Sequence, residues 1–266
     1  MQPTAIEALR RDIVRTSHAL HARGWVANHD GNLSARLDEP GDDAMRVLCT
    51  PTAVSKGDVR PEWLIVVDGE RRVVEGTRRA FSELSLHLAA FRARPDIRVV
   101  IHAHPPTVTG FAVAGVPLPH PFMAEPVVSL GPVLPVLPYR PPGQAGAEDD
   151  LARALGLADA VILDRHGLLT VGGSFEQALL RMELVEHQAR IALVAHQLGG
   201  VRPLPAADVS TLAARGRPAS EPARAPAAST PVSSAVAAAS EQGSATLTGA
   251  RPDVRSVVSD ALSRFR

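Results

Sequence analysis

A glutamate and three histidines constrain this chain more than any other feature of its sequence. Glu83 lies within a helical pattern, and His102 and His104 stand one residue apart after the apolar run VVI. His166 follows much later, in LDRHGLL. Side chains two residues apart on a strand leave the same face, so the histidine pair could hold one divalent ion. Three neutral imidazoles with a carboxylate nearby are the parts of a catalytic metal site that keeps an open position.

Helical and strand patterns alternate around these residues and predict a mixed α/β fold. Apolar residues at helical spacing predict five helices, at 4–23, 80–92, 105–114, 145–156 and 174–198. Short apolar runs predict strands at 32–37, 45–50, 64–68 and 99–101, and two more within 159–171. We expect the proline-punctuated segment 126–138 to be extended. His102 and His104 then lie at the end of a strand, where mixed α/β sheets place their ligands.

The character of the sequence changes after about residue 204. Residues 205–250 are dominated by Ala, Ser, Pro, Thr and Gly, with few large apolar side chains. Such a segment cannot bury enough surface to offset its ordering entropy, so we predict a disordered linker there. Residues 251–266 show apolar spacing typical of a short C-terminal helix, with a frayed terminus as the alternative. We therefore expect a single domain over 1–204.

The balance of charge excludes some classes of partner. Lys and Arg number 28, as do Asp and Glu, so the net charge is zero and favours neither nucleic acid nor an anionic membrane as partner. One cysteine, Cys49, allows no internal disulfide, and no apolar run is long enough to cross a bilayer. We predict a cytoplasmic protein. The only lysine, Lys56, falls in a loop-like segment.

The run EGTRRAFSELSLHLAAFRARPDIRVVIHAHPPTVTGFAVAG resembles the class II aldolase/adducin family, of which fuculose-phosphate aldolases are members. GNLSAR at 31–36, TPT at 50–52 and VILDRHGLLTVG at 161–172 extend the resemblance over roughly residues 5–200. The resemblance implies a three-layer α/β/α sandwich with a central, mostly antiparallel sheet. It also implies a homotetramer with its site at a subunit interface.

The resemblance assigns chemical roles to the four residues noted first. It implies a divalent metal, Zn²⁺ before Mn²⁺ or Co²⁺, held by His102, His104 and His166. Glu83 would be the catalytic acid/base and a fourth metal ligand when no substrate is bound. The implied activity is that of an aldehyde-lyase, which makes or breaks a C–C bond in a small sugar or keto-acid-like substrate through a metal-stabilised enediolate.

The sequence departs from the family in the residues that bind a substrate phosphate. The resemblance assigns substrate binding to Asn32, Thr52 and Ser82. The family has a glycine after the threonine and a second serine before Ser82, whereas this chain has Ala53 and Phe81. Close backbone approach and small donors are what a phosphate site requires. We therefore expect a substrate without a phosphate, or one whose phosphate is held differently.

A second departure concerns the proton donor. Aldolases of this type use a tyrosine, but the corresponding segment HPFMAEP carries Phe122, and Tyr139 is the only tyrosine. This difference weakens aldol cleavage and leaves a related epimerase, dehydratase or decarboxylase as alternatives. A non-catalytic, adducin-like interaction module is the least favoured alternative, because all three histidines are kept. For His29 and Asp30, in the NHDGN turn, we expect a role in stabilising the turn.

Overall fold

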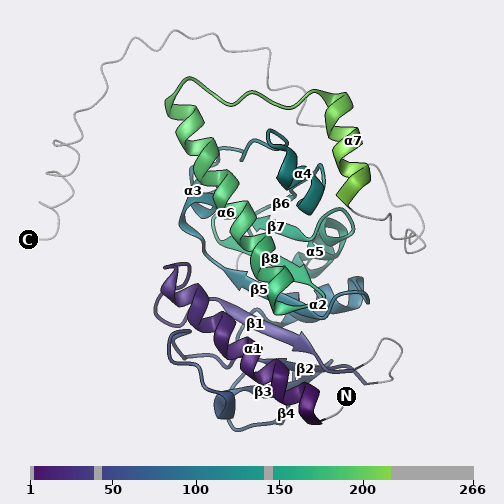
Figure 1. The fold of residues 1–266 in the computed structure, drawn as a ribbon. Helices are drawn as coiled ribbons and strands as arrows, with labels where there is room; N and C mark the ends of the chain where they lie inside the picture. The colour runs from purple at the N-terminus through teal and green to yellow at the C-terminus, as the bar shows by residue number, and fades with distance from the viewer. Residues whose placement is uncertain (1–2, 39–43, 141–145, 217–266) are drawn as a thin grey trace, which may run out of the picture. The chain divides into compact units, whose positions relative to one another are not determined.

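A single mostly antiparallel sheet organises the part of the chain that the structure describes. The structure is a computed structural model, and it describes residues 3–38, 44–140 and 146–216. Eight strands lie there in the order β4-β3-β2-β1-β5-β8-β7-β6 (Figure 1). Their bounds are β1 (Asn32–Arg36), β2 (Arg46–Cys49), β3 (Ile65–Asp68), β4 (Val73–Glu75), β5 (Val99–Ala103), β6 (Val136–Leu137), β7 (Ala160–Leu163) and β8 (Gly167–Gly172). Neighbouring strands are antiparallel except for the parallel pair β6 and β7.

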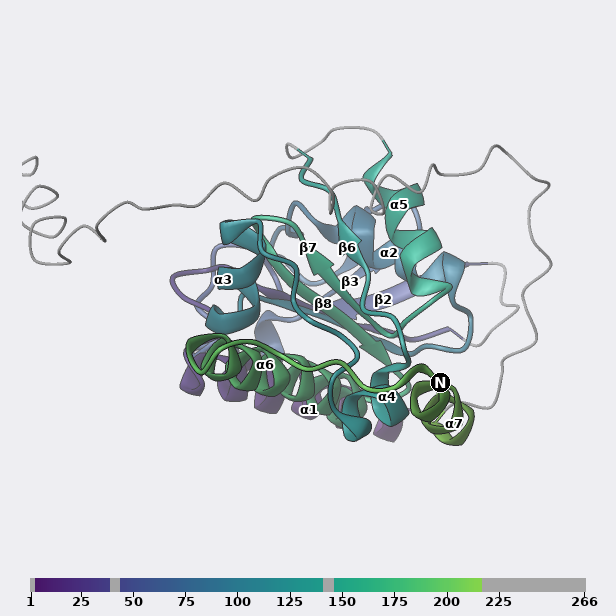
Figure 2. The same cartoon turned by 90° about the horizontal axis from the view of Figure 1, so that it is seen from above.

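Helices cover both faces of this sheet. The helices are α1 (Pro3–Ala22), α2 (Leu84–Ala93), α3 (Pro106–Ala114), α4 (Ala124–Leu130), α5 (Ala147–Leu155), α6 (Phe175–Gln197) and α7 (Ala206–Gly216), with a short 3-10 helix, η1 (Pro61–Trp63). In Figure 2, α1 and α6 run along one face, and α2 and α5 lie on the other. The fold is therefore the three-layer α/β/α sandwich that the sequence predicted.

Alternation along the strands divides the apolar side chains into two cores. Ile101 of β5 packs in the core under α1 and α6, whereas its neighbour Val100 packs in the core under α2 and α5. His102, next along the strand, leaves the same face as Val100. The metal-binding candidates therefore face the α2 side of the sheet. Each fully buried large apolar side chain in these cores contributes about 1.5–3 kcal/mol.

The predicted extended segment 126–138 and the start of the helix predicted at 80–92 both differ in the structure. The segment 126–138 is not mainly extended: its first part belongs to α4, and β6 covers only two residues. Pro126 lies in the first turn of α4, where a proline is tolerated because the N–H it lacks would have no helical partner. Helix α2 begins at Leu84 rather than near residue 80, so Glu83 occupies its N-cap position.

The predicted disordered linker also needs correction at its start. Residues 206–216 form α7, and alanine, the strongest helix former, supplies four of these eleven positions. The helix ends close to α4, since a Cβ atom on Gly216 would lie 1.8 Å from the carbonyl oxygen of Val128. The remaining linker, 217–250, and the predicted helix within 251–266 lie outside the described residues.

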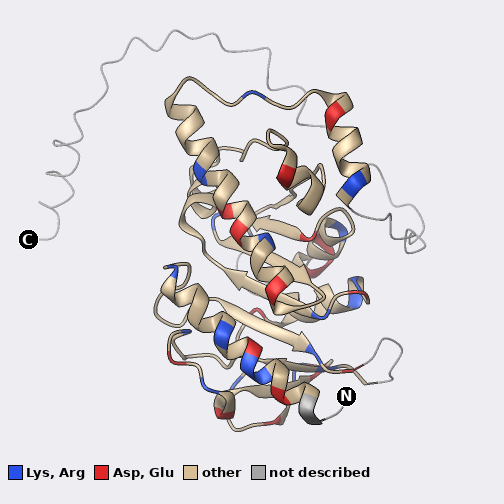
Figure 3. Cartoon of the chain, viewed as in Figure 1, with Lys and Arg blue, Asp and Glu red and all other residues tan. Residues whose placement is uncertain are grey.

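Charged residues of both signs interleave along α1 and α6 (Figure 3). Arg23, just beyond α1, pairs with Glu183 of α6, and Arg15 pairs with Asp12 at 3.0 Å on α1 itself. The charges thus link adjacent helices and turns of one helix. Of the described helices, none combines the length and the hydrophobicity needed to span a membrane.

Candidate functional site

Strand β5 and the β7–β8 turn bring the three predicted histidines together. His102 is in β5, His104 follows its last residue, and His166 lies in the turn that joins β7 to β8. The ring centroids of the three pairs lie 4.7, 4.9 and 5.2 Å apart. One nitrogen from each ring lies within 4.8 Å of the other two. Among the described residues, this is the group of His, Cys, Asp or Glu side chains placed to share a metal ion.

Hydrogen bonds on the far side of two rings favour metal binding. Nδ1 of His102 lies 3.1 Å from the carbonyl oxygen of Leu168, and Nδ1 of His104 lies 2.8 Å from Oδ2 of Asp30. Both oxygens only accept, so each Nδ1 carries the proton and each Nε2 has a free lone pair. The two Nε2 atoms face each other at 3.1 Å. Bonds of about 2.0–2.1 Å from each nitrogen to Zn²⁺ fit such a separation.

Glu83 points at these histidines and does not cap its helix. Its side chain makes no capping hydrogen bond, although it occupies the N-cap position of α2. Oε1 lies 3.0 Å from Nε2 of His166, and Oε2 lies 3.6 Å from Nε2 of His102. Oε2 also accepts a hydrogen bond of 2.8 Å from Nδ2 of Asn32, at the start of β1. The carboxylate therefore stands beside the position that a shared ion would take.

The surroundings keep these groups in the protonation states that a metal requires. Burial raises the pKa of Glu83, but its electrostatic interaction with His102 and the hydrogen bonds from His166 and Asn32 lower it by more, so its pKa lies well below its usual range. Burial lowers the pKa of His102 to about 4, against the opposing effect of Glu83. At neutral pH the site thus offers an ionised carboxylate and a neutral imidazole, the ligand forms of both groups.

A cavity of about 990 Å³ opens beside the histidines. Its lining includes the predicted site residues Asn32, Thr52, Ser82, Glu83, His104 and His166. His102, which is 1 % exposed, lies behind them. The structure thus brings together every residue that the sequence singled out for the site.

The two altered phosphate-site positions disturb the cavity less than the sequence suggested. Ala53 has φ +58°, in the left-handed region that favours the glycine of related chains. Phe81 is 8 % exposed, and its ring packs edge-on against His87 with centroids 5.0 Å apart. The ring therefore belongs largely to the core, although Phe81 also lines the cavity together with Thr52 and Ser82.

Sequence reasoning missed several residues around the site. Asp30 does stabilise its turn, because its Oδ1 accepts a hydrogen bond of 2.5 Å from the amide of Ala27. Its Oδ2 also accepts a hydrogen bond from the ring of His104. His87 is fully buried, and its Nδ1 lies 2.6 Å from Oγ of Ser34. Burial lowers its pKa to about 3. Its spacing of four residues from Glu83 was the available signal, because it places both on one helix face.

Tyr139 and Phe122, the two residues considered for the proton donor, lie in different parts of the structure. Tyr139 lines the cavity, is half exposed, and carries the guanidinium of Arg165 5.2 Å from its ring centroid. Phe122 packs instead against the core under α1 and α6. A tyrosine hydroxyl is thus present at the cavity, though it comes from a different segment than the one the family uses.

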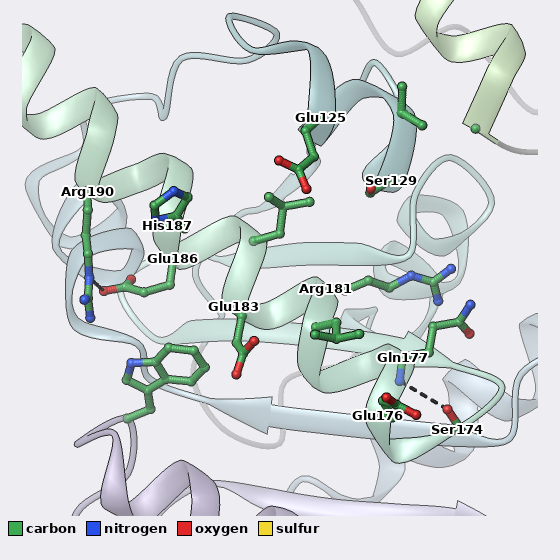
Figure 4. Close-up of a pocket in the computed structure, with 15 residues that line it drawn as sticks. Glu125, Ser129, Ser174, Glu176, Gln177, Arg181, Glu183, Glu186, His187 and Arg190 are labelled. Carbon is green, nitrogen blue, oxygen red and sulfur yellow. Dashed lines mark hydrogen bonds and ion pairs between the residues drawn. The ribbon is translucent and has the colours of Figure 1, made fainter.

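A second cavity, also of about 990 Å³, lies beside α4 and α6 (Figure 4). Glu125, Ser129, Glu183, His187 and Arg190 are among its lining residues. The histidine triad and Glu83 do not line it. The chemistry of the metal-binding candidates therefore belongs to the first cavity.

Comparison with known proteins agrees with this geometry. The family model described as Class II Aldolase and Adducin N-terminal domain matches residues 11–193. The chain is 27 % identical over 204 residues to a 5-deoxy-D-ribulose 1-phosphate aldolase of Bacillus thuringiensis serovar kurstaki, covering 77 % of this chain and 93 % of that protein. It is 29 % identical to a 3-oxo-tetronate 4-phosphate decarboxylase of Pectobacterium atrosepticum, covering 76 % and 91 %. A solved L-fuculose 1-phosphate aldolase superposes with a TM-score of 0.70 at 26 % identity, covering 78 % and 95 %.

Proposed function

We propose, because the chain belongs to the class II aldolase and adducin family, that it is a metal-dependent lyase acting on a small hydroxylated carbonyl compound. The observation that carries the proposal is the position of Glu83, 3.0 Å from His166 and 3.6 Å from His102 at the edge of the cavity. A carboxylate beside three neutral imidazoles combines a site for a cation with a group that moves protons.

The histidines fit a divalent metal, and Zn²⁺ suits them best. Three imidazole nitrogens leave one position of a tetrahedral ion open, which is the arrangement of catalytic zinc sites. Bound there, the ion would stabilise negative charge on the oxygens of an enediolate. Because His102 and His104 are neutral ligands, they would leave the double charge of the ion undiminished. Mn²⁺ and Co²⁺ are the alternatives for the same donors.

The chain's own residues supply the remaining steps. Glu83 moves the proton at the carbon next to the carbonyl group, and the hydrogen bond from Asn32 fixes the direction of its carboxylate. Leu168 and Asp30 hold the rings of His102 and His104 in one tautomer. Tyr139 lines the cavity and supplies a phenolic hydroxyl that protonates the second product.

We propose a phosphorylated substrate, contrary to the expectation from sequence. The left-handed φ of Ala53 keeps the backbone conformation of a glycine, and Phe81, which lines the cavity, is mostly buried. Asn32, Thr52 and Ser82 therefore offer donors to one end of the cavity. The names of both curated relatives specify a phosphate ester, which supports the same conclusion.

Decarboxylation of a phosphorylated keto acid is the second candidate reaction. The relative named as a decarboxylase matches this chain as well as the one named as an aldolase does. Loss of CO₂ from a 3-keto acid that carries a hydroxyl at C2 leaves an enediolate, as aldol cleavage does, and needs one proton returned to carbon. The segment of Phe122 contributes no hydroxyl to the cavity, since Phe122 packs against the core, and this favours a reaction that does not need a donor for a departing aldehyde.

Metal analysis combined with a substrate screen tests the proposal. We expect about one divalent ion per chain, lost in His102→Ala and in His166→Ala, because three ligands are needed for tight binding. Ketose phosphates and phosphorylated 3-keto acids, each beside its dephosphorylated form, are then assayed for aldehyde and for CO₂. Stoichiometric metal in both variants would contradict the assignment of these histidines as metal ligands. Equal turnover of the dephosphorylated compounds would contradict the proposal that the substrate carries a phosphate.

The resemblance to the family also leads us to propose a cytoplasmic homotetramer. Light scattering of the purified chain tests its mass, and a monomer that turns over substrate would contradict this part.

A further inference from the structure

The only lysine of the chain is buried. Lys56 lies in the loop between β2 and η1, and 1 % of its surface is exposed. An ammonium group loses its hydration when it is buried, and this loss is unfavourable unless other polar groups replace the water. The ammonium group of Lys56 must therefore be stabilised by polar groups of the protein.

The ammonium of Lys56 joins two loops that are far apart in sequence. Nζ donates a hydrogen bond of 3.3 Å to the carbonyl oxygen of His29, in the turn between α1 and β1. It donates a second, of 3.0 Å, to the carbonyl oxygen of Val54, in its own loop. Its charge also interacts with the carboxylate of Asp30. One buried cation thus fixes the separation of the two loops.

The first of these loops supports a metal-binding candidate. Asp30 accepts from Nδ1 of His104 at 2.8 Å and from the amide of Ala27 at 2.5 Å. The amide of His104 donates to the carbonyl oxygen of Trp25 at 2.9 Å, just before the same turn. The turn is tight, with φ +50° at Asn28 and +67° at Gly31. A shift of the turn would therefore move both the backbone and the ring of His104.

The second loop supports the other side of the cavity. Val54 follows Ala53 and Thr52, and Thr52 lines the cavity. The amide of Thr52 donates to the carbonyl oxygen of Arg79 at 3.0 Å, so the loop is held from both ends. Lys56 itself is not among the lining residues. Its contribution to the site therefore passes through the loops it holds.

We propose that Lys56 is a positioning residue whose ammonium, bonded to the turn that carries Asp30, sets the orientation of His104 for metal binding. The inference rests on the proposed function only in requiring that the three histidines bind a divalent ion. It assigns to Lys56 a role at the site without contact with the ion or the substrate.

Cobalt binding by a variant without the ammonium tests the inference. Lys56→Met keeps an unbranched side chain and removes the charge and its donors. Loss of a group that orients a metal ligand weakens metal binding by about 10- to 100-fold. We expect a fall of about tenfold in the affinity for Co²⁺, measured from its visible absorption, and a changed spectrum from the reoriented His104.

A matched control separates positioning from loss of stability. Val59, three residues along and 1 % exposed, belongs to the core under α1 and α6. Val59→Ala loosens the same loop without touching the ammonium, so we expect its Co²⁺ affinity and spectrum to match those of the unaltered chain. Equal losses in Lys56→Met and Val59→Ala, or no loss in Lys56→Met, would overturn the inference.

A second measurement serves if Lys56→Met does not fold. Protein labelled with [¹³Cε]lysine gives a single lysine NMR signal, since the chain has one lysine. We expect this signal to shift when the unaltered protein is saturated with Zn²⁺, because the charge of the ion changes the electrostatic surroundings of Asp30, which bonds to His104 and interacts with the ammonium. An unchanged signal in a protein that binds Zn²⁺ would overturn this inference and leave the proposed function standing. Failure of the unaltered chain to bind any divalent ion would overturn the proposed function with it.

Discussion

Glu83 shows how much the position of one carboxylate decides at this site. The residue could have been a helix-capping acid, yet its side chain makes no capping bond and faces His102 and His166. We predict that Glu83→Gln keeps its metal, because the three imidazoles remain. Turnover should fall about 10²- to 10⁴-fold, since the amide cannot accept a proton. Metal content and steady-state rates measure both effects.

The control for this prediction is Glu148→Gln. Glu148 lines the same cavity but is exposed and makes none of the contacts with the histidines described above. We expect its rates to stay close to those of the unaltered chain. A fully active Glu83→Gln would remove Glu83 from the mechanism. Equal losses in both variants would point to the charge of the cavity instead.

The burial of Lys56 predicts a pH dependence of stability. Burial lowers its pKa from 10.5 to about 8, although Asp30 opposes this shift. The unfolded chain therefore binds more protons than the folded chain between pH 8 and 10.5, so this group makes stability rise with pH in that window. The slope can reach about 1.4 kcal/mol per pH unit.

Urea unfolding of metal-free protein measures this slope. We expect the free energy of unfolding of the unaltered chain, relative to Lys56→Met, to increase by about 2 kcal/mol from pH 8 to 10. The comparison cancels the titration of Tyr139 and the arginines, which both proteins share. A difference that stays constant over this range would show that the buried lysine keeps its ordinary pKa.

Site residues were predictable from the sequence when their side-chain chemistry coincided with a recognisable spacing or position along the chain. His102, His104 and His166 were found because a two-residue repeat and a strand-turn junction mark them. Asp30 and Lys56 were not, because their partners lie far away in sequence and only the folded chain reveals the contacts. The burial of Lys56 has no sequence signal, since a lysine in a loop is usually exposed.

At the scale of elements, the docking of α2 on β1 places Glu83. Asn32 and Ser34, two apart on one face of β1, bond to Glu83 and His87, four apart on one face of α2. The strand and helix spacings match, because both separate their side chains by about 6–7 Å. The two polar pairs therefore fix the register of the helix against the strand.

Removing one of these pairs should destabilise the fold. We predict that Ser34→Ala lowers the free energy of unfolding by about 1–3 kcal/mol, because Nδ1 of His87 is then buried without its partner. Ser17→Ala is the matched control. Ser17 is also fully buried, and its Oγ has no hydrogen-bond partner among the described residues, so its removal should be nearly neutral. Similar changes in the two variants would mean that the pair contributes nothing.

Helices and strands were predicted correctly where the apolar residues followed a clear helical or strand period. The prediction failed where prolines interrupted that period. The long helix α6 was predicted with its cap: Oγ of Ser174 accepts from the amide of Gln177 at 3.1 Å. Helix α4 was taken for extended chain because Pro126 was read as a breaker, although it lies in the first turn. Strand β4 was missed because its three residues are exposed and pair at the sheet edge.

At the scale of the whole molecule, the site and both cores lie in one compact unit, Met1–Ser220. The first cavity takes its lining from segments between residues 29 and 166. The described residues of the metal site all lie before residue 221, so we expect a chain ending at 220 to bind Co²⁺ as the full chain does. The sequence placed the end of the domain at 204 because it could not show that α7 packs against α4.

Two truncations therefore give different results. A chain ending at residue 220 should keep the melting temperature of the full chain. A chain ending at 204 loses α7, whose half-buried Val209 and Leu212 contribute about 1–3 kcal/mol, so it should melt about 3–8 °C lower. Its Co²⁺ affinity should stay unchanged, because α7 does not line the cavity beside the histidines. Weaker metal binding in the chain ending at 220 would contradict the placement of the whole site in this unit.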